Sequence, residues 1–265
     1  MRKLFLKASG RTPQLSFPSY EAALSASDGT GYQSSNVVDV VVQKNKIYQD
    51  HLQRTRTLGI DTLRLAVGLA AVERKGPTLS VIDFGGGGGT QFFAARSLLG
   101  SAENITWNVV ETPAMVKAAN ANLACRGLRF FESIEEAEED MGVVDLVFAS
   151  GSLQYTPDPL AMLRRLVSIE APHLYITRTS FNDQQETMFA LQHSRLSHNG
   201  PGPLPEGFND EGVSYPVTFS PKNDAEDVIS AKYEIRFAVK EEVGAYRVAS
   251  RSFDMHGYFC DLKRR

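Results

Sequence analysis

The sequence has little of what marks a secreted, metal-binding or membrane-spanning protein. Its two cysteines, Cys125 and Cys260, lie far apart and outside any CxxC or Cys/His cluster, which argues against disulfides and metal binding. No run of about 18 apolar residues is available to cross a bilayer. The apolar core of residues 1–7 is too short for a signal peptide. We therefore expect a cytoplasmic protein with no metal centre and no membrane insertion.

An excess of charge of one sign is also missing. The chain carries 28 Lys and Arg against 31 Asp and Glu, a formal net charge of −3. A nearly neutral chain lacks the broad basic surface that binds nucleic acid or an acidic membrane, so neither partner is expected. The length of 265 residues suits one large domain, or one domain with a cap.

From residue 79 onward the hydrophobic pattern predicts strands and helices in alternation. Strands are expected at 79–84, 105–111, 128–131, 143–150 and 173–178, and helices at 90–99, 114–125, 134–140 and 160–169. This alternation is typical of βαβ units, which form an α/β fold with a parallel sheet and right-handed crossovers. Further strands at 233–239, 246–253 and 257–262 could add an antiparallel pair at the sheet edge.

Residues 1–76 are expected to form a helical cap before a sheet domain that spans residues 77–265. A short helix is expected at 20–27 and a second one from Ser35, a residue that can cap a helix. Valine has a weak helix propensity, so a strand at 37–42 stays an alternative. The apolar face of the second helix comprises Val37, Val38, Val41, Ile47, Tyr48 and Leu52.

A third helix is expected from Asp61 to Lys75, where Gly76 and Pro77 end it. Its apolar residues follow a helical period. They are Leu63, Val67, Ala70 and Ala71.

One stretch organises the rest of the chain, the run VIDFGGGGGT at residues 81–90. A buried strand there leads into a glycine loop and then a helix, an arrangement that lets the backbone approach a polar ligand closely. A phosphate-binding P-loop requires Lys and Ser or Thr after its last glycine, but Thr90 and Gln91 follow here. A dinucleotide site requires GxGxxG, and no register of this run supplies the third glycine. An NAD-dependent oxidoreductase is therefore a less favoured alternative.

The remaining pattern is an acid two residues before GxGxG, which Asp83, Gly85, Gly87 and Gly89 fit. It resembles the first motif of class I S-adenosylmethionine-dependent methyltransferases. The resemblance implies a Rossmann-like fold with a mostly parallel seven-stranded sheet, helices on both faces and an antiparallel C-terminal strand pair. It also implies S-adenosyl-L-methionine as cofactor, with the loop against its ribose and methionine portion and Asp83 ordering its polar tail.

A second acid supports the same cofactor. Glu111 ends the next expected strand, 22 residues after Gly89, and a carboxylate there can accept hydrogen bonds from two ribose hydroxyls. The following Thr112-Pro113 resembles the acid-x-Pro stretch of small-molecule O-methyltransferases, which implies that Met115 covers the adenine. A plain core position is the alternative for Met115. By the same resemblance Glu132 and Ser133 contact the adenine amino group, and Ser150 and Gly151 contact the methionine tail.

The acceptor is expected at the ends of the fourth and fifth strands. Gln154 and Tyr155 can line its pocket, although Tyr155 also suits a plain turn. Arg178 can hold an anionic acceptor, with an ordinary surface ion pair as the alternative. The Gly- and Pro-rich segment 181–230 is expected to contribute to this site, because long insertions between elements are usually functional or mobile.

A general base is needed if the acceptor is a hydroxyl. Three histidines lie outside the cofactor half, His193, His198 and His256. His198 is the first choice, because its loop can close over the sheet edge. The predicted catalytic group is therefore His198 with Tyr155 and Arg178.

A closer resemblance rests on VVETP at 109–113, ASGSLQY at 149–155, ITRT at 176–179, SYP at 214–216 and HGY at 256–258. Together they resemble a family of proteins assigned as methyltransferases and often associated with bacterial surface-polysaccharide clusters. This implies methyl transfer to a small-molecule or sugar acceptor, with O-methylation expected. The chain departs from the family after Leu196, where it is richer in glycine and proline. A scaffold that binds the cofactor without turnover is the alternative, and a homodimer stays open.

Overall fold

A seven-stranded sheet forms the centre of the computed structural model, which describes residues 15–27, 31–55, 57–59, 62–74, 76–100 and 104–264. Its strand order is β4-β3-β2-β5-β6-β10-β9. The strands are β2 (Leu79–Phe84), β3 (Ile105–Val110), β4 (Leu128–Phe131), β5 (Leu146–Ser150), β6 (His173–Ser180), β9 (Tyr233–Val248) and β10 (Arg251–Leu262). Strands β2 to β6 are parallel, and β10 is antiparallel to both β6 and β9. The predicted α/β sheet with its antiparallel C-terminal pair is confirmed.

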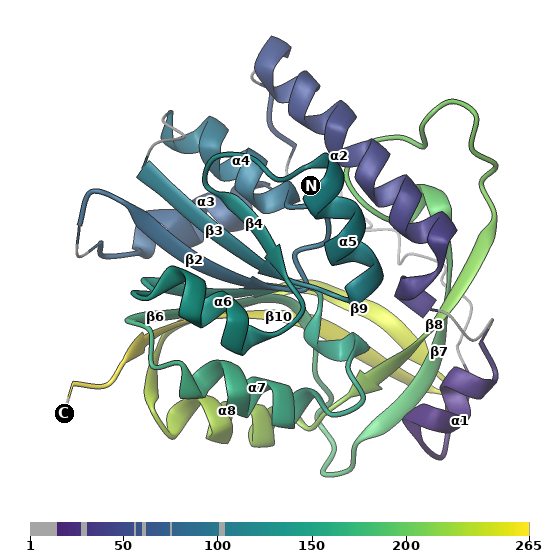
Figure 1. Cartoon of the computed structure of the whole chain (residues 1–265). Helices are drawn as coiled ribbons and strands as arrows, with labels where there is room; N and C mark the ends of the chain where they lie inside the picture. The colour runs from purple at the N-terminus through teal and green to yellow at the C-terminus, as the bar shows by residue number, and fades with distance from the viewer. Residues whose placement is uncertain are drawn as a thin grey trace, which may run out of the picture.

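Helices cover both faces of this sheet (Figure 1). One layer contains α2 (Ser35–Thr55), α3 (Thr62–Ala71), α4 (Thr90–Leu99) and α5 (Pro113–Asn122), and the other contains α6 (Ile134–Met141), α7 (Pro159–Ser168) and α8 (Lys222–Ser230). Neighbouring strand residues face opposite layers, as Val81 and Ile82 do in the two separate core clusters. Both faces are buried, which explains the near-continuous apolar runs in the sequence.

The long N-terminal helix is confirmed, and the alternative of a strand at 37–42 is wrong. Val37, Val38, Val41 and Leu52 are buried in α2. Ile47 was expected on the same face but is 48% exposed. The helix buries its valines against α4 and α5, and this packing compensates for their weak propensity.

The apolar face expected for α3 is wrong. Leu63 and Val67 are 58% and 50% exposed, whereas Leu65 and Leu69 are buried. The helix is oriented with Gly68 toward the sheet, because the backbone of Gly68 packs on the ring of Tyr175. A Cβ atom at Gly68 would lie 2.5 Å from that ring. Close helix–sheet approach therefore decides this face more than the spacing of large side chains does. The expected ends, Asp61 and Lys75, lie outside the described residues.

The segment 181–230 contains regular structure that its composition did not indicate. It holds β7 (Met188–Arg195), β8 (Gly212–Phe219) and α8, and β7 pairs with both β8 and the short β1 (Ser16–Phe17). The short helix α1 (Tyr20–Ser25) packs against this second sheet. The strand expected at 246–253 is interrupted by a hairpin turn at residues 249–250, because β9 ends at Val248 and β10 begins at Arg251. None of the described helices combines the length and apolarity needed to cross a membrane.

Candidate active site

The glycine loop connects the end of β2 to the first turn of α4. Gly85, Gly87 and Gly89 all adopt left-handed backbone conformations, with φ of 71°, 58° and 79°. L-residues other than glycine are strained there, so the alternating glycines allow a turn this tight. Gly89 is the N-cap of α4, and the open backbone N–H groups of the first turn follow it.

Asp83 lies directly beneath this loop and is fully buried. Its Oδ2 accepts a hydrogen bond of 2.9 Å from the indole Nε1 of Trp107, while its Oδ1 has no partner among the described residues. A Cβ atom on Gly86 would lie 2.4 Å from Oδ2, so only glycine at position 86 lets the loop pack against the carboxyl group. Burial raises the pKa of Asp83 to about 7; the Trp107 bond opposes this and the nearby Glu111 adds to it.

Glu111 follows β3 on the same edge of the sheet. Its two carboxyl oxygens accept hydrogen bonds from the backbone N–H groups of Gly87 (3.1 Å) and Thr112 (2.8 Å). Burial raises the pKa of Glu111, and these two N–H groups oppose the rise. Two carboxyl groups from adjacent strands therefore converge on the glycine loop.

A cavity of about 450 Å³ opens above these groups. It brings together eight of the residues proposed from the sequence. They are Asp83, Gly85, Gly87, Glu111, Met115, Ser150, Arg178 and His198. Met115 is 4% exposed, so its side chain serves both the core and the cavity wall.

The other proposed cofactor residues lie outside the cavity lining. A Cβ atom on Gly89 would lie 2.9 Å from Leu128, so this glycine serves close packing. Ser133 caps α6 by accepting a hydrogen bond of 3.2 Å from the N–H of Glu136, and its neighbour Glu132 is exposed. Thr112 is the N-cap of α5, and its buried hydroxyl has no hydrogen-bond partner among the described residues. Gly151 lies beneath Arg178.

The cavity is roofed by two segments far apart in the sequence, α2 and residues 198–202. Asn45 of α2 lies against Gly88, and its Oδ1 accepts a hydrogen bond of 2.8 Å from Thr90. Lys44 is buried, and its Nζ donates a hydrogen bond of 2.7 Å to the carbonyl oxygen of Ser197. The sequence offered one signal for these residues, since they follow Val41 by three and four positions and so share its face of the helix.

Tyr155 lies in a cluster of tyrosines beside the cavity rather than in its lining. Its hydroxyl donates a hydrogen bond of 3.1 Å to Oε1 of Gln192 and lies 3.1 Å from the hydroxyl of Tyr246. Tyr32 stacks on Tyr215 with ring centroids 4.2 Å apart, and it is the member that lines the cavity. Burial raises the pKa of Tyr155, so its hydroxyl stays protonated at neutral pH.

The three candidate histidines occupy different places. His198 ends the short 3-10 helix η4 (Leu196–His198) and lines the cavity. His193 lies on β7 and His256 on β10, and neither lines the cavity. Burial lowers the pKa of His256, and its Nδ1 has no partner among the described residues. Position alone therefore favours His198 beside the cavity.

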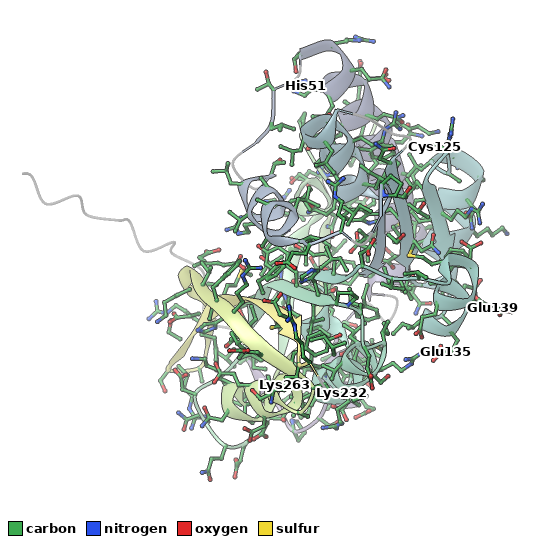
Figure 2. The ribbon with its side chains drawn as sticks, turned by 90° about the vertical axis from the view of Figure 1, so that its left-hand side faces the viewer. His51, Cys125, Glu135, Glu139, Lys232 and Lys263 are labelled. Atoms are coloured by element: carbon green, nitrogen blue, oxygen red, sulfur yellow. The ribbon has the colours of Figure 1, made fainter. Side chains whose placement is uncertain are left out.

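A second hollow, of about 1110 Å³, lies at the amino edge of the sheet. Lys232 and Lys263 lie close together there (Figure 2), and Lys232 pairs with Glu170. His173 in the same hollow contacts Asp261 at 2.9 Å. Lys232 and His173 therefore have carboxylate partners, whereas Oδ1 of Asp83 has no partner among the described residues. Among the described residues, no group of three His, Cys, Asp or Glu side chains could hold a metal ion.

Comparisons with known proteins give only distant likenesses. No protein-family model and no curated protein matches the sequence. A solved S-adenosylmethionine-dependent methyltransferase from Clostridium acetobutylicum is 12% identical with a TM-score of 0.49, over 83% of this chain and 99% of that one. The N-terminal domain of EvdMO1, solved in the presence of SAH and D-fucose, is 13% identical with a TM-score of 0.45, over 77% and 82%. LepI in complex with SAM is 12% identical with a TM-score of 0.44, over 75% and 46%. Matches this distant assign neither a cofactor nor a reaction to the chain.

Proposed function

We propose that the protein transfers a methyl group from S-adenosyl-L-methionine to a small-molecule acceptor. The observation that carries this proposal is the buried carboxyl group of Asp83. Its Oδ1 lacks a partner among the described residues, and it lies beneath a glycine loop in which Gly86 leaves no room for a Cβ atom. A buried, unpartnered oxygen is costly, and it suggests a polar ligand group that completes its hydrogen bonding.

The residues present fit this cofactor. The ammonium end of its methionine portion is a cation, which complements the acid of Asp83. The carboxylate of Glu111 can accept from two ribose hydroxyls. Met115 supplies an apolar surface for the adenine. When bound, the cofactor supplies an electrophilic methyl group on a positively charged sulfur, which the two carboxyl groups also favour.

The acceptor is proposed to bind against Arg178 of β6, in the same cavity that His198 lines. The roof formed by α2 and residues 198–202 would exclude water there and hold the acceptor in line. We propose O-methylation with His198 as general base, because His198 is the one histidine among the described residues that lines the cavity. Tyr155 is proposed to shape the wall through Tyr32 rather than to move a proton. A sugar acceptor remains part of the proposal through the family resemblance.

Calorimetric titration tests the cofactor assignment. S-adenosylmethionine and its demethylated product should bind the wild-type protein, while NADH should not. Asp83→Ala and Gly87→Val should abolish binding, because one removes the acid and the other places a branched side chain at φ 58°. Glu139→Gln, an exposed change on α6, should bind normally and serves as the matched control. Normal binding by Asp83→Ala would contradict the proposed site.

Methyl transfer separates the enzyme from the scaffold alternative. Cofactor with a labelled methyl group is incubated with nucleotide sugars and small phenols, and incorporation of label is counted. Transfer that disappears in His198→Ala, with cofactor affinity unchanged, supports His198 as general base. Tight cofactor binding with no label transferred across the panel would favour a protein that binds without turnover.

A further inference from the structure

A β-bulge in β6 aims Arg178 into the cavity. The pairing of β6 with β10 shifts between Ile176, opposite Tyr258, and Thr179, opposite His256, so that Thr177 and Arg178 face Gly257 alone. Arg178 takes a left-handed conformation at φ 56°, one of three described residues other than glycine with positive φ. Bulges of this kind bend a strand and redirect a side chain, and they are frequent beside active sites.

Glu241 of β9 holds this bulge from two strands away. Its Oε1 accepts a hydrogen bond of 3.0 Å from the backbone N–H of Arg178 and another from the hydroxyl of Thr177. Its Oε2 lies 2.6 Å from the Nε of Arg64 on α3. The carboxylate is almost fully enclosed, with 4% of its side chain exposed. A buried charge is costly unless it is paired, and here all its bonds go to fixing the bulge and α3.

The intervening strand lets the carboxylate through because it carries glycine at the crossing point. A Cβ atom on Gly257 would lie 2.4 Å from the Oε1 of Glu241. A side chain at that position would push the carboxylate away from the N–H of Arg178. Gly257, Glu241 and the bulge therefore form one device spanning three strands.

The guanidinium that this device presents has no counter-ion among the residues that the structure describes. Arg178 is exposed and lies over Gly151, whose virtual Cβ atom is 3.6 Å from the guanidinium carbon. No ion pair to Arg178 occurs within the part of the chain that the structure describes. The acids that line the cavity, Asp83 and Glu111, lie at the ends of β2 and β3, whereas Arg178 lies on β6 beyond the intervening β5. The cavity is therefore acidic at one end and basic at the other.

We propose that Arg178 is the binding residue for an oxyanion, a carboxylate or phosphate carried by the acceptor, and that Glu241 is its positioning residue. This inference rests on the proposed function, since it names the class of acceptor for that same cavity. A planar guanidinium binds such groups through two parallel hydrogen bonds, which fixes the acceptor in orientation as well as in place.

The test titrates inorganic phosphate, and separately acetate, into the full-length protein saturated with demethylated cofactor. The Nε–H signal of Arg178 and its backbone amide signal are followed by nitrogen-15 NMR. Wild-type protein should show saturable shifts with millimolar affinity, and Arg178→Met should weaken binding at least tenfold. A preference for phosphate or for acetate identifies which oxyanion the acceptor carries.

Two variants of one side chain isolate positioning from folding. Glu241→Gln keeps an oxygen that can accept from the N–H of Arg178, and it should bind phosphate within twofold of wild type. Glu241→Leu has similar bulk and no acceptor, and it should lose at least fivefold in affinity and move the amide proton signal of Arg178 upfield. Thr177→Val, which removes only the second hydrogen bond to Glu241, should fall between the two.

The outcomes separate this inference from the proposed function. Phosphate affinity that is equal in wild type and Arg178→Met overturns the oxyanion site, even if the cofactor binds tightly. Equal affinity in Glu241→Leu and Glu241→Gln overturns the positioning role alone. If the demethylated cofactor fails to bind, the proposed function fails, and titration of phosphate into the protein without it still decides whether Arg178 binds oxyanions.

Discussion

Asp83→Asn should stabilise the protein without ligand while weakening its binding of cofactor. Burial raises the pKa of Asp83 from an ordinary value of 3.8 to about 7 in the folded protein. Between these values the native state holds a proton that the unfolded chain has released, so stability falls as the pH rises. At 1.36 kcal/mol per pH unit the loss approaches about 4 kcal/mol and is complete above pH 7 to 8. Asparagine accepts the same bond from Trp107 and carries no charge to desolvate.

Urea unfolding between pH 5 and pH 8.5 measures this effect. The unfolding free energy of Asp83→Asn minus that of wild type should increase with pH by about 2–4 kcal/mol and then level off near pH 8. Calorimetry on the same two proteins should show cofactor affinity reduced about 10- to 100-fold, the cost of losing a charged hydrogen bond. Glu139→Gln, at an exposed carboxylate, should leave both quantities unchanged. Parallel stability curves for Asp83→Asn and wild type would refute the reasoning.

Three other substitutions test separate features. Glu111→Gln should weaken cofactor binding about 10- to 100-fold with little change in stability. An unchanged affinity in calorimetry would contradict the role of Glu111 in binding the ribose. Gly88→Ala should cost about 1–3 kcal/mol, because its Cβ atom would lie 2.5 Å from Asn45, and a cycle with Asn45→Ala should recover part of that loss in urea unfolding. Arg178→Gly should be more stable than Arg178→Met by about 1 kcal/mol, because glycine relieves the left-handed strain; equal melting curves would mean that no strain is stored there.

Local signals in the sequence predicted the part of the fold in which each residue's role depends on its near neighbours. The alternation of strands and helices, and the acids Asp83 and Glu111 at strand ends, follow from short-range pattern. Because parallel strands end at one edge of the sheet, the approach of these two acids to the glycine loop was also foreseeable. The fold class could therefore be predicted without knowledge of tertiary contacts.

The rest depends on contacts between distant segments. Nothing near Glu241 in the sequence indicates that its carboxylate reaches Arg178, because the path requires a glycine 16 residues later, at Gly257. The buried face of α3 is decided by the packing of Gly68 against Tyr175. Hydrophobic periodicity does not detect this contact, because glycine has no apolar side chain to mark the position. Strands β7 and β8 were missed because prolines and glycines dominate the loops around them, and the pairing of β7 with β1 joins parts of the chain over 170 residues apart.

The position of β10 has a consequence for how the protein matures. This strand follows every other described strand in chain order, yet it lies inside the sheet, between β6 and β9. While a nascent chain lacks β10, β6 presents an open edge that can pair with other chains. In this state the chain can aggregate unless a chaperone binds it. The bulge opposite Gly257 cannot form before then either, so the basic end of the cavity is the last part to be assembled. A chain released early could thus carry a complete glycine loop and still be unable to orient an acceptor.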